Sequence, residues 1–540
     1  MTNFKIIKQI FYQFLIAICA AFVFELIFKG LTISTFYNTL ENILFSVLLV
    51  SPLFLIPYRV IQTGYITVAY ILFCLSIYFE AVYYYFFEAF LSASSLFVSL
   101  DSNRSEATEF LNFYLDTKVI VFSIVMILLL TISVYKFSTK LSYFKKQPKL
   151  PVVKVSVYVL VILAFLKFSS LIVYNLPYLI LKSTIEYSVE SVKLGDYKTN
   201  KTGNFSDVSR PESNEDEVYV VILGESTSRA HFGLYNYPRA TTPNLNSLKE
   251  ELNIYTDVIS AHPHSITSIT KLLTLGNYEH PDKIAAGSII QLANKAGFET
   301  VWLSNQRPIG VYESLVTKIA LSSTKSKFLT TTFGVHNKVL DGALLLELET
   351  ILKDVSVSKK LIIIHLMGTH LSYANRYPEA FNKFNDVPFS NYKSEETTKI
   401  INDYDNAVLY SDFVISQIIQ KTKALNQKSF VLYFSDHGEE LFKDYNMAGH
   451  NEDISTKDMY DVPFFLWQSD LFKQDKQLTN AVDRPYMLDD LFHSLADLLE
   501  ISAQEVDFER SVFSSKFKTR LTQFELTSKS KTRLHQGRRP

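Results

Sequence analysis

The sequence predicts a two-part membrane protein, in which an N-terminal anchor of five transmembrane helices precedes an extracytoplasmic α/β domain with a mostly parallel sheet. Two observations predict this architecture. The first third of the 540 residues contains five long apolar runs, and from residue 218 short apolar runs of β type alternate with helical stretches. The composition agrees, because 48% hydrophobic and 14% aromatic residues exceed what a soluble chain of this length usually carries.

The five apolar runs are each about 16–25 residues long, enough for a helix to cross a hydrocarbon core of about 30 Å. They lie around residues 10–28, 42–57, 62–86, 119–135 and 155–176. No small-residue cleavage site follows the first run, so we expect it to remain as an anchor. The predicted transmembrane segment therefore covers residues 1–176.

Basic residues predict the orientation of this anchor. Lysines precede the first run, Arg59 lies between the second and third runs, and six lysines crowd the connection 136–154. These segments are expected on the cytoplasmic side, whereas the acidic segment 87–117 suits the opposite side. An odd number of spans then places everything after residue 176 outside the cytoplasm.

The outer part divides into three segments. Residues 177–217 are expected to form an interfacial helix followed by a polar linker, and residues 511–540 a basic tail near anionic lipid. Between them, residues 218–510 are expected to form one α/β domain with helices such as 285–296 and 405–420. Its predicted strands are 218–223, 300–303, 361–366, 430–435 and 462–467.

Two classes of feature are excluded by composition. Both cysteines, Cys19 and Cys74, fall inside predicted spans, so the outer domain has no disulfide available. The formal net charge of −1 is uninformative about nucleic acid, but no basic stripe carries interleaved aromatic residues, so nucleic acid is not expected as a partner.

Chemically active side chains follow three of the predicted strands. Glu225 comes directly after 218–223, His370 comes shortly after 361–366, and Asp436 and His437 follow 430–435. Because the carboxyl ends of parallel strands meet at one edge of a sheet, these side chains are expected to gather there. Two carboxylates and an imidazole make a site for a divalent cation. A hydroxyl from "ISAHPHSITSITKLLT" (259–274) would complete it, because a metal ion activates a weak hydroxyl nucleophile.

These residues stand in longer motifs that resemble a known family, the membrane-anchored phosphoethanolamine transferases of the alkaline phosphatase/sulfatase superfamily. The motifs are "GESTSRAHFGLYNYPRATTPNL" (224–245), "DVISAHPHSITSITKLLT" (257–274), "WLSNQ" (302–306), "HLMGTHLSYANRYP" (365–378), "YDNAVLYSD" (404–412) and "YFSDHGEELF…AGH" (433–450). They occur in the family's order beneath the same five-span anchor. The resemblance covers nearly the whole chain and implies a catalytic domain of alkaline phosphatase/sulfatase type.

The resemblance implies a nucleophile and a metal site. Counting along the family pattern places the nucleophile at Ser265, where most members carry Thr; Thr267 and Ser268 stay as alternatives. Glu225, Asp436 and His437 resemble the zinc ligands, with Ser265 as the fourth. One tight Zn²⁺ site is expected, with a second zinc as an open alternative and Mn²⁺ as the alternative metal.

The resemblance also implies roles for other polar side chains. His370 and His450 resemble the pair that holds the transferring phosphate, protonates the leaving alkoxide or binds a second metal, and Asn305 resembles a contact to the substrate head group. His262 and His264 are expected to form a polar rim beside the nucleophile, because the four-ligand site is complete without them. His365 is expected to be a satisfied core histidine.

The implied reaction is transfer of phosphoethanolamine from phosphatidylethanolamine to an envelope glycan, either lipopolysaccharide core or lipid A, through a covalent serine intermediate. The implied location is the bacterial inner membrane, with the catalytic domain in the periplasm. The absence of Cys from the outer domain and the spellings "HPHSI" and "WLSNQ" favour the lipopolysaccharide-core branch. Two alternatives are a phosphoglycerol transferase on the same scaffold and a catalytically inactive lipid-binding scaffold.

Overall fold

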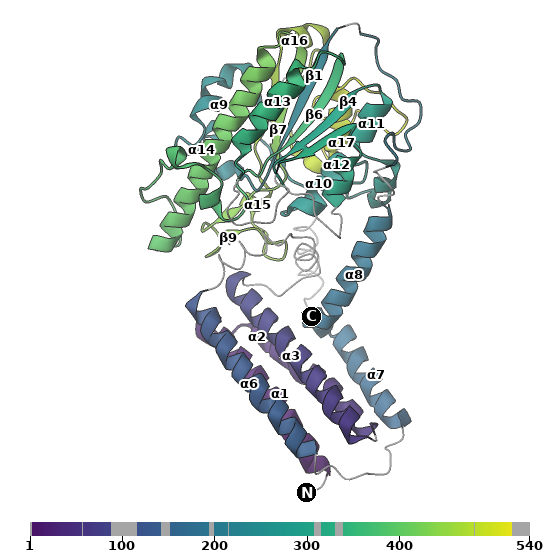
Figure 1. Cartoon of the computed structure of the whole chain (residues 1–540), viewed down its shortest axis with the longest axis vertical. Helices are drawn as coiled ribbons and strands as arrows, with labels where there is room; N and C mark the ends of the chain where they lie inside the picture. Colours follow the sequence, from purple (N-terminus) through teal and green to yellow (C-terminus); the bar gives the residue numbers. More distant parts are fainter. Residues whose placement is uncertain are drawn as a thin grey trace, which may run out of the picture. The chain divides into compact units, whose positions relative to one another are not determined.

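The computed structural model describes residues 3–56, 58–87, 116–141, 152–193, 199–213, 215–306, 315–329, 339–479 and 481–520. These residues form two compact units, one made of the described residues up to 187 and the other of the described residues from 188 onward (Figure 1). The predicted division into a helical anchor and an α/β domain is confirmed. We describe each unit by itself.

The first unit consists of long apolar helices. They are α1 (Asn3–Lys29), α2 (Ile33–Val50), α3 (Arg59–Phe87), α6 (Thr117–Leu141), α7 (Val152–Phe168) and, at its end, α8 (Leu176–Lys193). Within the described residues, four helical spans are long and apolar enough to cross a membrane: 5–28, 35–54, 59–82 and 117–137. They correspond to the first four predicted runs. Helix α1 packs against α2, α3 and α6 around a core that includes Phe14, Tyr70 and Phe73.

The fifth predicted run, 155–176, is divided in the structure. Helix α7 has only 17 residues and ends at Phe168, eight residues before the end of this run. Ser170 then adopts a left-handed backbone with φ of 61°, and a short 3₁₀ turn η2 (Leu171–Tyr174) follows. A residue in the left-handed conformation cannot continue a right-handed helix. The helix therefore ends here, although the apolar sequence continues.

The second unit is built on a seven-stranded sheet with the order β2-β10-β7-β1-β6-β4-β5. Its strands are β1 (Glu217–Gly224), β2 (Leu252–Tyr255), β4 (Glu299–Ser304), β5 (Lys325–Phe328), β6 (Lys359–His365), β7 (Lys428–Ser435) and β10 (Phe464–Gln468). The strands from β7 to β5 are parallel, whereas β10 is antiparallel to both β7 and β2. All five predicted strands are present, and the mostly parallel sheet is confirmed.

Helices cover the sheet because its central strands are apolar on both faces. All eight residues of β1 are buried, as are all eight of β7. The long helix α14 (Glu395–Lys423) packs on β7 and α11 (Ile289–Lys295) packs on β4 (Figure 1). Helix α14 begins earlier than the sequence predicted because the Ser394 hydroxyl caps it, accepting from the Thr397 amide at 3.0 Å.

Packing in this unit continues beyond residues 218–510 on both sides. Phe205, only 3% exposed, stacks on Phe492 with ring centroids 5.6 Å apart. On the other side, Val512 and Phe513 are buried. Part of the expected linker and the first residues of the expected tail therefore belong to the folded domain. Residues 521–540 lie outside the described residues.

Candidate active site

Three neighbouring parallel strands end at the same level and deliver the predicted side chains to one edge of the sheet. In β1, Leu223 pairs with His365 of β6 and Gly224 pairs with Ser435 of β7. Glu225 and Asp436 are the next residues of their strands, so the register places them together. Gly368 lets the loop after β6 pass against them: its φ is +54°, and an added Cβ would lie 2.7 Å from the Glu225 carbonyl oxygen.

Ser265 reaches this edge from a helix. It is the first residue of α10 (Ser265–Leu273), and its hydroxyl donates to Glu225 Oε1 at 2.8 Å and lies 3.3 Å from His437 Nε2. Ser268, one turn later and fully buried, donates instead to the backbone oxygen of Asp436 at 2.6 Å. The Ser268 hydroxyl therefore fixes the helix, while the Ser265 hydroxyl faces the carboxylate and imidazole.

The geometry of Glu225, Asp436 and His437 fits a metal ion. Their candidate ligand atoms all lie within 4.8 Å of one another, and the three side chains are buried. His437 Nδ1 donates to the Gly438 carbonyl at 2.8 Å, which leaves Nε2 facing the carboxylates. Asp436 Oδ1 accepts two backbone N–H bonds, but its Oδ2 is buried with no hydrogen-bond partner among the described residues. A cation would satisfy that oxygen.

The pKa values in this cluster also indicate a site that fits a cation. Burial and the neighbouring charge of Glu225 raise the pKa of Asp436 to about 7. Burial also opposes ionisation of Glu225, but the hydrogen bond and charge of His437 outweigh it and leave the Glu225 pKa well below its usual range. Conversely, the two carboxylates overcome burial and raise the pKa of His437 to about 10. The metal-free site thus holds a proton where a divalent cation would bind.

His450 lies beside this cluster and is oriented by a buried carboxylate. Its ring centroid is 4.2 Å from that of His437, and its Nδ1 lies 2.9 Å from Glu439 Oε1. The Tyr373 hydroxyl donates to the other oxygen of Glu439 at 3.2 Å. His437, Glu439 and His450 form a second group of potential metal ligands.

His370 is held through its backbone rather than through its ring. Its carbonyl accepts from Arg376 Nε at 3.0 Å, and its Nδ1 has no hydrogen-bond partner among the described residues. Burial lowers the pKa of His370 to about 4, although the charge of Glu225 opposes the shift. The imidazole is therefore neutral at physiological pH.

The structure gives Asn305 partners other than the expected substrate head group. Its amide is fully buried and donates to the Val339 carbonyl at 2.9 Å and to Asp341 Oδ1 at 2.8 Å. The next residue, Gln306, donates to Glu225 Oε2 at 3.0 Å. His365 is buried as expected, but it is not fully satisfied, because its Nε2 has no partner among the described residues.

Comparison with known proteins identifies the family. A family model described as Sulfatase matches residues 217–501. The phosphoethanolamine transferase EptC of Escherichia coli K12 is 30% identical over 511 residues, which cover 88% of this chain and 87% of that protein. The chain belongs to the phosphoethanolamine transferases of the sulfatase family. The resemblance carried by the motifs is thereby confirmed.

Two solved structures of phosphoethanolamine transferases are similar to this chain. The C-terminal periplasmic domain of E. coli EptC, crystallised in complex with Zn, is 34% identical and has a TM-score of 0.56; the match covers 58% of this chain and 91% of that one. The integral membrane protein EptA of Neisseria meningitidis shares the fold along the whole chain, with a TM-score of 0.69 at 20% identity, covering 95% of this chain and 98% of that one.

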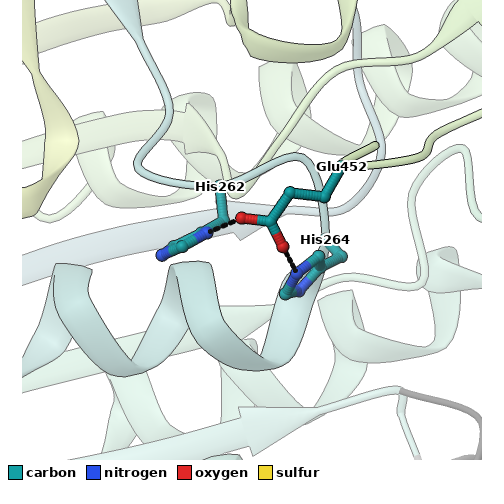
Figure 2. Close-up of side chains that lie close together, drawn as sticks. All are labelled: His262, His264 and Glu452. Atoms are coloured by element: carbon teal, nitrogen blue, oxygen red, sulfur yellow. Dashed lines mark hydrogen bonds and ion pairs between the residues drawn. The ribbon is translucent and has the colours of Figure 1, made fainter. Parts of the chain in front are cut away.

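This transferase has a further cluster beside Ser265, which the sequence did not indicate. His262 Nδ1 lies 3.0 Å from Glu452 Oε1, and His264 Nε2 lies 2.9 Å from Glu452 Oε2, so that one carboxylate bridges two imidazoles (Figure 2). The expected polar rim is therefore a specific three-residue arrangement. Glu452 stands two residues after His450, yet no spacing in the sequence connects it with 262–264.

Gln306 and Glu439 were also missed as site residues. Each lies inside a quoted motif, directly after Asn305 or two residues after His437. Their positions in those motifs were the available signal, but the sequence does not show the direction in which either side chain points.

Proposed function

We propose that this enzyme transfers phosphoethanolamine from phosphatidylethanolamine to an envelope glycan, lipopolysaccharide core or lipid A, through a covalent intermediate on Ser265. The single observation that carries the proposal is the position of the Ser265 hydroxyl, 2.8 Å from Glu225 and 3.3 Å from His437 at the cation-binding edge. The named activity of the E. coli EptC relative supports the transferred group.

Glu225, Asp436, His437 and Ser265 would hold Zn²⁺, the metal in the crystallised E. coli EptC domain. Bound there, the ion would lower the pKa of the serine hydroxyl and offset negative charge on the substrate phosphate. The unpartnered Asp436 Oδ2 and the inward-facing His437 Nε2 support this donor set. A carboxylate and imidazole set with one hydroxyl suits zinc, with Mn²⁺ as the alternative.

In the proposed reaction, Ser265 Oγ attacks the phosphorus of the donor, and its proton leaves toward Glu225 Oε1, which already accepts it in a hydrogen bond. The bond from phosphorus to the glycerol oxygen then breaks, and diacylglycerol departs with a proton from a histidine. His450 suits this role in its protonated form, because Glu439 orients its ring and opposes the lowering of its pKa by burial. The neutral His370 suits binding of the phosphate. In the second step a hydroxyl or protonated phosphate oxygen of the acceptor attacks the phosphorus and gives its proton to the histidine, the bond from phosphorus to Ser265 Oγ breaks, and Ser265 recovers its proton from Glu225.

The membrane helices support a lipid donor. Four described helices are long enough to cross the bilayer, so the enzyme is held beside its lipid substrates at high effective concentration. By analogy with the periplasmic domains of its relatives, we place this chain in the bacterial inner membrane with the catalytic domain in the periplasm.

The test is intact-mass analysis of the purified full-length protein in detergent after incubation with Zn²⁺ and phosphatidylethanolamine. We expect an added phosphoethanolamine on wild type that maps to residue 265 and is absent from Ser265→Ala. Ser268→Ala is the matched control, because it removes a hydroxyl from the same helix that instead contacts the Asp436 backbone. Ser265→Thr should retain the label.

Three outcomes would contradict parts of the proposal. A label that persists in Ser265→Ala but disappears in Thr267→Ala would move the nucleophile. A label obtained from phosphatidylglycerol instead of phosphatidylethanolamine would identify a phosphoglycerol transferase. Absence of both label and product in a folded, zinc-loaded protein would favour the inactive scaffold.

A further inference from the structure

The cluster formed by His262, His264 and Glu452 is compact and largely enclosed. Both histidines are buried, and the Glu452 side chain is 26% exposed. The ligand atoms of the three residues lie within 4.8 Å of one another, and both carboxylate oxygens face an imidazole nitrogen (Figure 2). None of these residues belongs to the set Glu225, Asp436, His437 and Ser265.

A neighbouring tyrosine determines where the proton of His262 lies. The Tyr278 hydroxyl is 2.6 Å from the Ala261 carbonyl oxygen, which can only accept, so the hydroxyl proton points there. The same hydroxyl oxygen is 2.8 Å from His262 Nε2 and must accept from it. His262 Nε2 therefore carries a hydrogen.

With hydrogen on Nε2, the Nδ1 atom of His262 is left facing Glu452 without a proton to donate. In a neutral imidazole with hydrogen on Nε2, Nδ1 carries a lone pair. That lone pair would face Glu452 Oε1 at 3.0 Å, which places an acceptor against an acceptor. The contact is attractive only if a cation lies between the two atoms, either a second proton on the ring or a metal ion.

The surroundings disfavour the second proton. Burial lowers the pKa of His262 to about 4, although the hydrogen bond to Glu452 opposes that shift. A charged His264 would add repulsion, since the two rings lie with centroids 5.4 Å apart. Hydrogen bonds to the two histidines meanwhile outweigh burial and hold the pKa of Glu452 well below its usual range. The cluster thus offers a metal ion two imidazole nitrogens and a carboxylate, whose ligand atoms lie within 4.8 Å of one another.

We propose that His262, His264 and Glu452 bind a divalent transition-metal ion, Zn²⁺ by their chemistry, at a second site beside Ser265. Two imidazoles and one carboxylate form the three-ligand set of zinc sites that keep a position open for water or for an oxygen of a substrate. Because His264 directly precedes Ser265, that open position suits a phosphate oxygen of a substrate. The site itself depends only on these three residues and not on the proposed transfer reaction.

The test counts zinc in the full-length protein. Metal-stripped protein in detergent is reloaded with Zn²⁺, and the bound metal is measured by elemental analysis and by competition with a chromogenic chelator. Glu452→Gln keeps the size of the side chain but removes its charge, and we expect it to bind one zinc equivalent fewer than wild type. Glu225→Gln should lose a different equivalent, and the double variant should lose both. Equal zinc content and affinity in wild type and Glu452→Gln would overturn the proposal in favour of a protonated hydrogen-bond cluster.

A second measurement does not need a folded Glu452 variant. Co²⁺ added to Glu225→Gln should give the visible absorption of a cobalt site with imidazole ligands, and His262→Gln in the same background should abolish it. Absence of that absorption in a folded Glu225→Gln protein would also overturn the proposal. Ser265→Ala should keep the cobalt signal of the second site, which separates this test from failure of the transfer reaction.

Discussion

Replacing Asp436 with Asn should stabilise the metal-free protein while abolishing its stabilisation by zinc. Asp436 Oδ1 accepts backbone bonds from Ser226 at 3.1 Å and from His437 at 2.8 Å, and an amide oxygen can accept both. The fold around residue 436 is therefore expected to survive. The substitution removes one of two neighbouring buried carboxylates and one ligand of the proposed zinc site.

The magnitude follows from the pKa of this carboxyl. Burial and Glu225 raise it from 3.8 to about 7. A raised carboxyl pKa means that the folded state resists ionisation, so its penalty is absent below pH 3.8, grows as the pH rises from 3.8 to 7, and levels off above 7. At pH 7.5 the penalty reaches up to about 4 kcal/mol, at about 1.4 kcal/mol per pKa unit. Metal-free Asp436→Asn should gain an energy of this order over metal-free wild type, seen as a higher melting temperature.

Zinc should narrow the stability difference between the two proteins. At a free zinc concentration of 100 times Kd, binding stabilises the wild type by about 2.7 kcal/mol, whereas a variant lacking a ligand gains little. The assay is thermal unfolding in detergent by intrinsic fluorescence, with chelator and with Zn²⁺. Asp412→Asn is the matched control, since Asp412 is also a fully buried carboxylate that accepts a backbone bond, from Leu245 at 2.8 Å. Its zinc response should match wild type, and an equal zinc response in Asp436→Asn would refute the assignment.

Three further predictions concern other parts of the catalytic domain. Glu439→Gln should lower kcat about 10-fold with little change in KM, because the ring of His450 loses its charged partner; an unchanged kcat would contradict the positioning role. Phe205→Ala should destabilise the domain by about 3–5 kcal/mol through loss of its buried stack, measured as a lower melting temperature, whereas a loose linker would show no change. Burial lowers the pKa of His493 to about 3, so unfolding should take up a proton below pH 6.5, and stability should fall as the pH drops from 6.5 toward 3. His493→Gln should reduce that slope by about 1.4 kcal/mol per pH unit, and an unchanged slope would exclude His493 as its source.

The sequence predicted that Glu225, Asp436 and His437 gather at one edge of the sheet, because strand ends in a parallel sheet share one level. Glu225 and Asp436 follow β1 and β7, and the observed register places them together without further information. Assignment of Ser265 needed the family resemblance, because several hydroxyls occur in its helix and only the structure shows which one faces Glu225. The contact of Glu452 with His262 depends on how two loops cross, which no local pattern encodes.

Local sequence patterns also fail to predict where the helix of the fifth apolar run ends. Hydropathy stays high across Ser170, but one left-handed residue ends helix α7. A hydropathy pattern reports which residues avoid water and not where the backbone turns. Hydropathy therefore predicts an anchor but does not locate the ends of its helices.

The metal-free catalytic edge is electrostatically unbalanced, and this links the fold to the proposed chemistry. Glu225, Asp436 and Glu439 are fully buried around His437, whose imidazole supplies at most one positive charge. Two strand ends brought to one level, those of β1 and β7, thus place three carboxyl groups around one imidazole, and Asp436 Oδ2, which accepts no hydrogen bond from the described residues, marks where positive charge is missing. A divalent cation supplies the missing charge without occupying the space of a side chain. The register that places these carboxylates together therefore favours the proposed metal site, and Ser265, the proposed nucleophile, lies at the same edge.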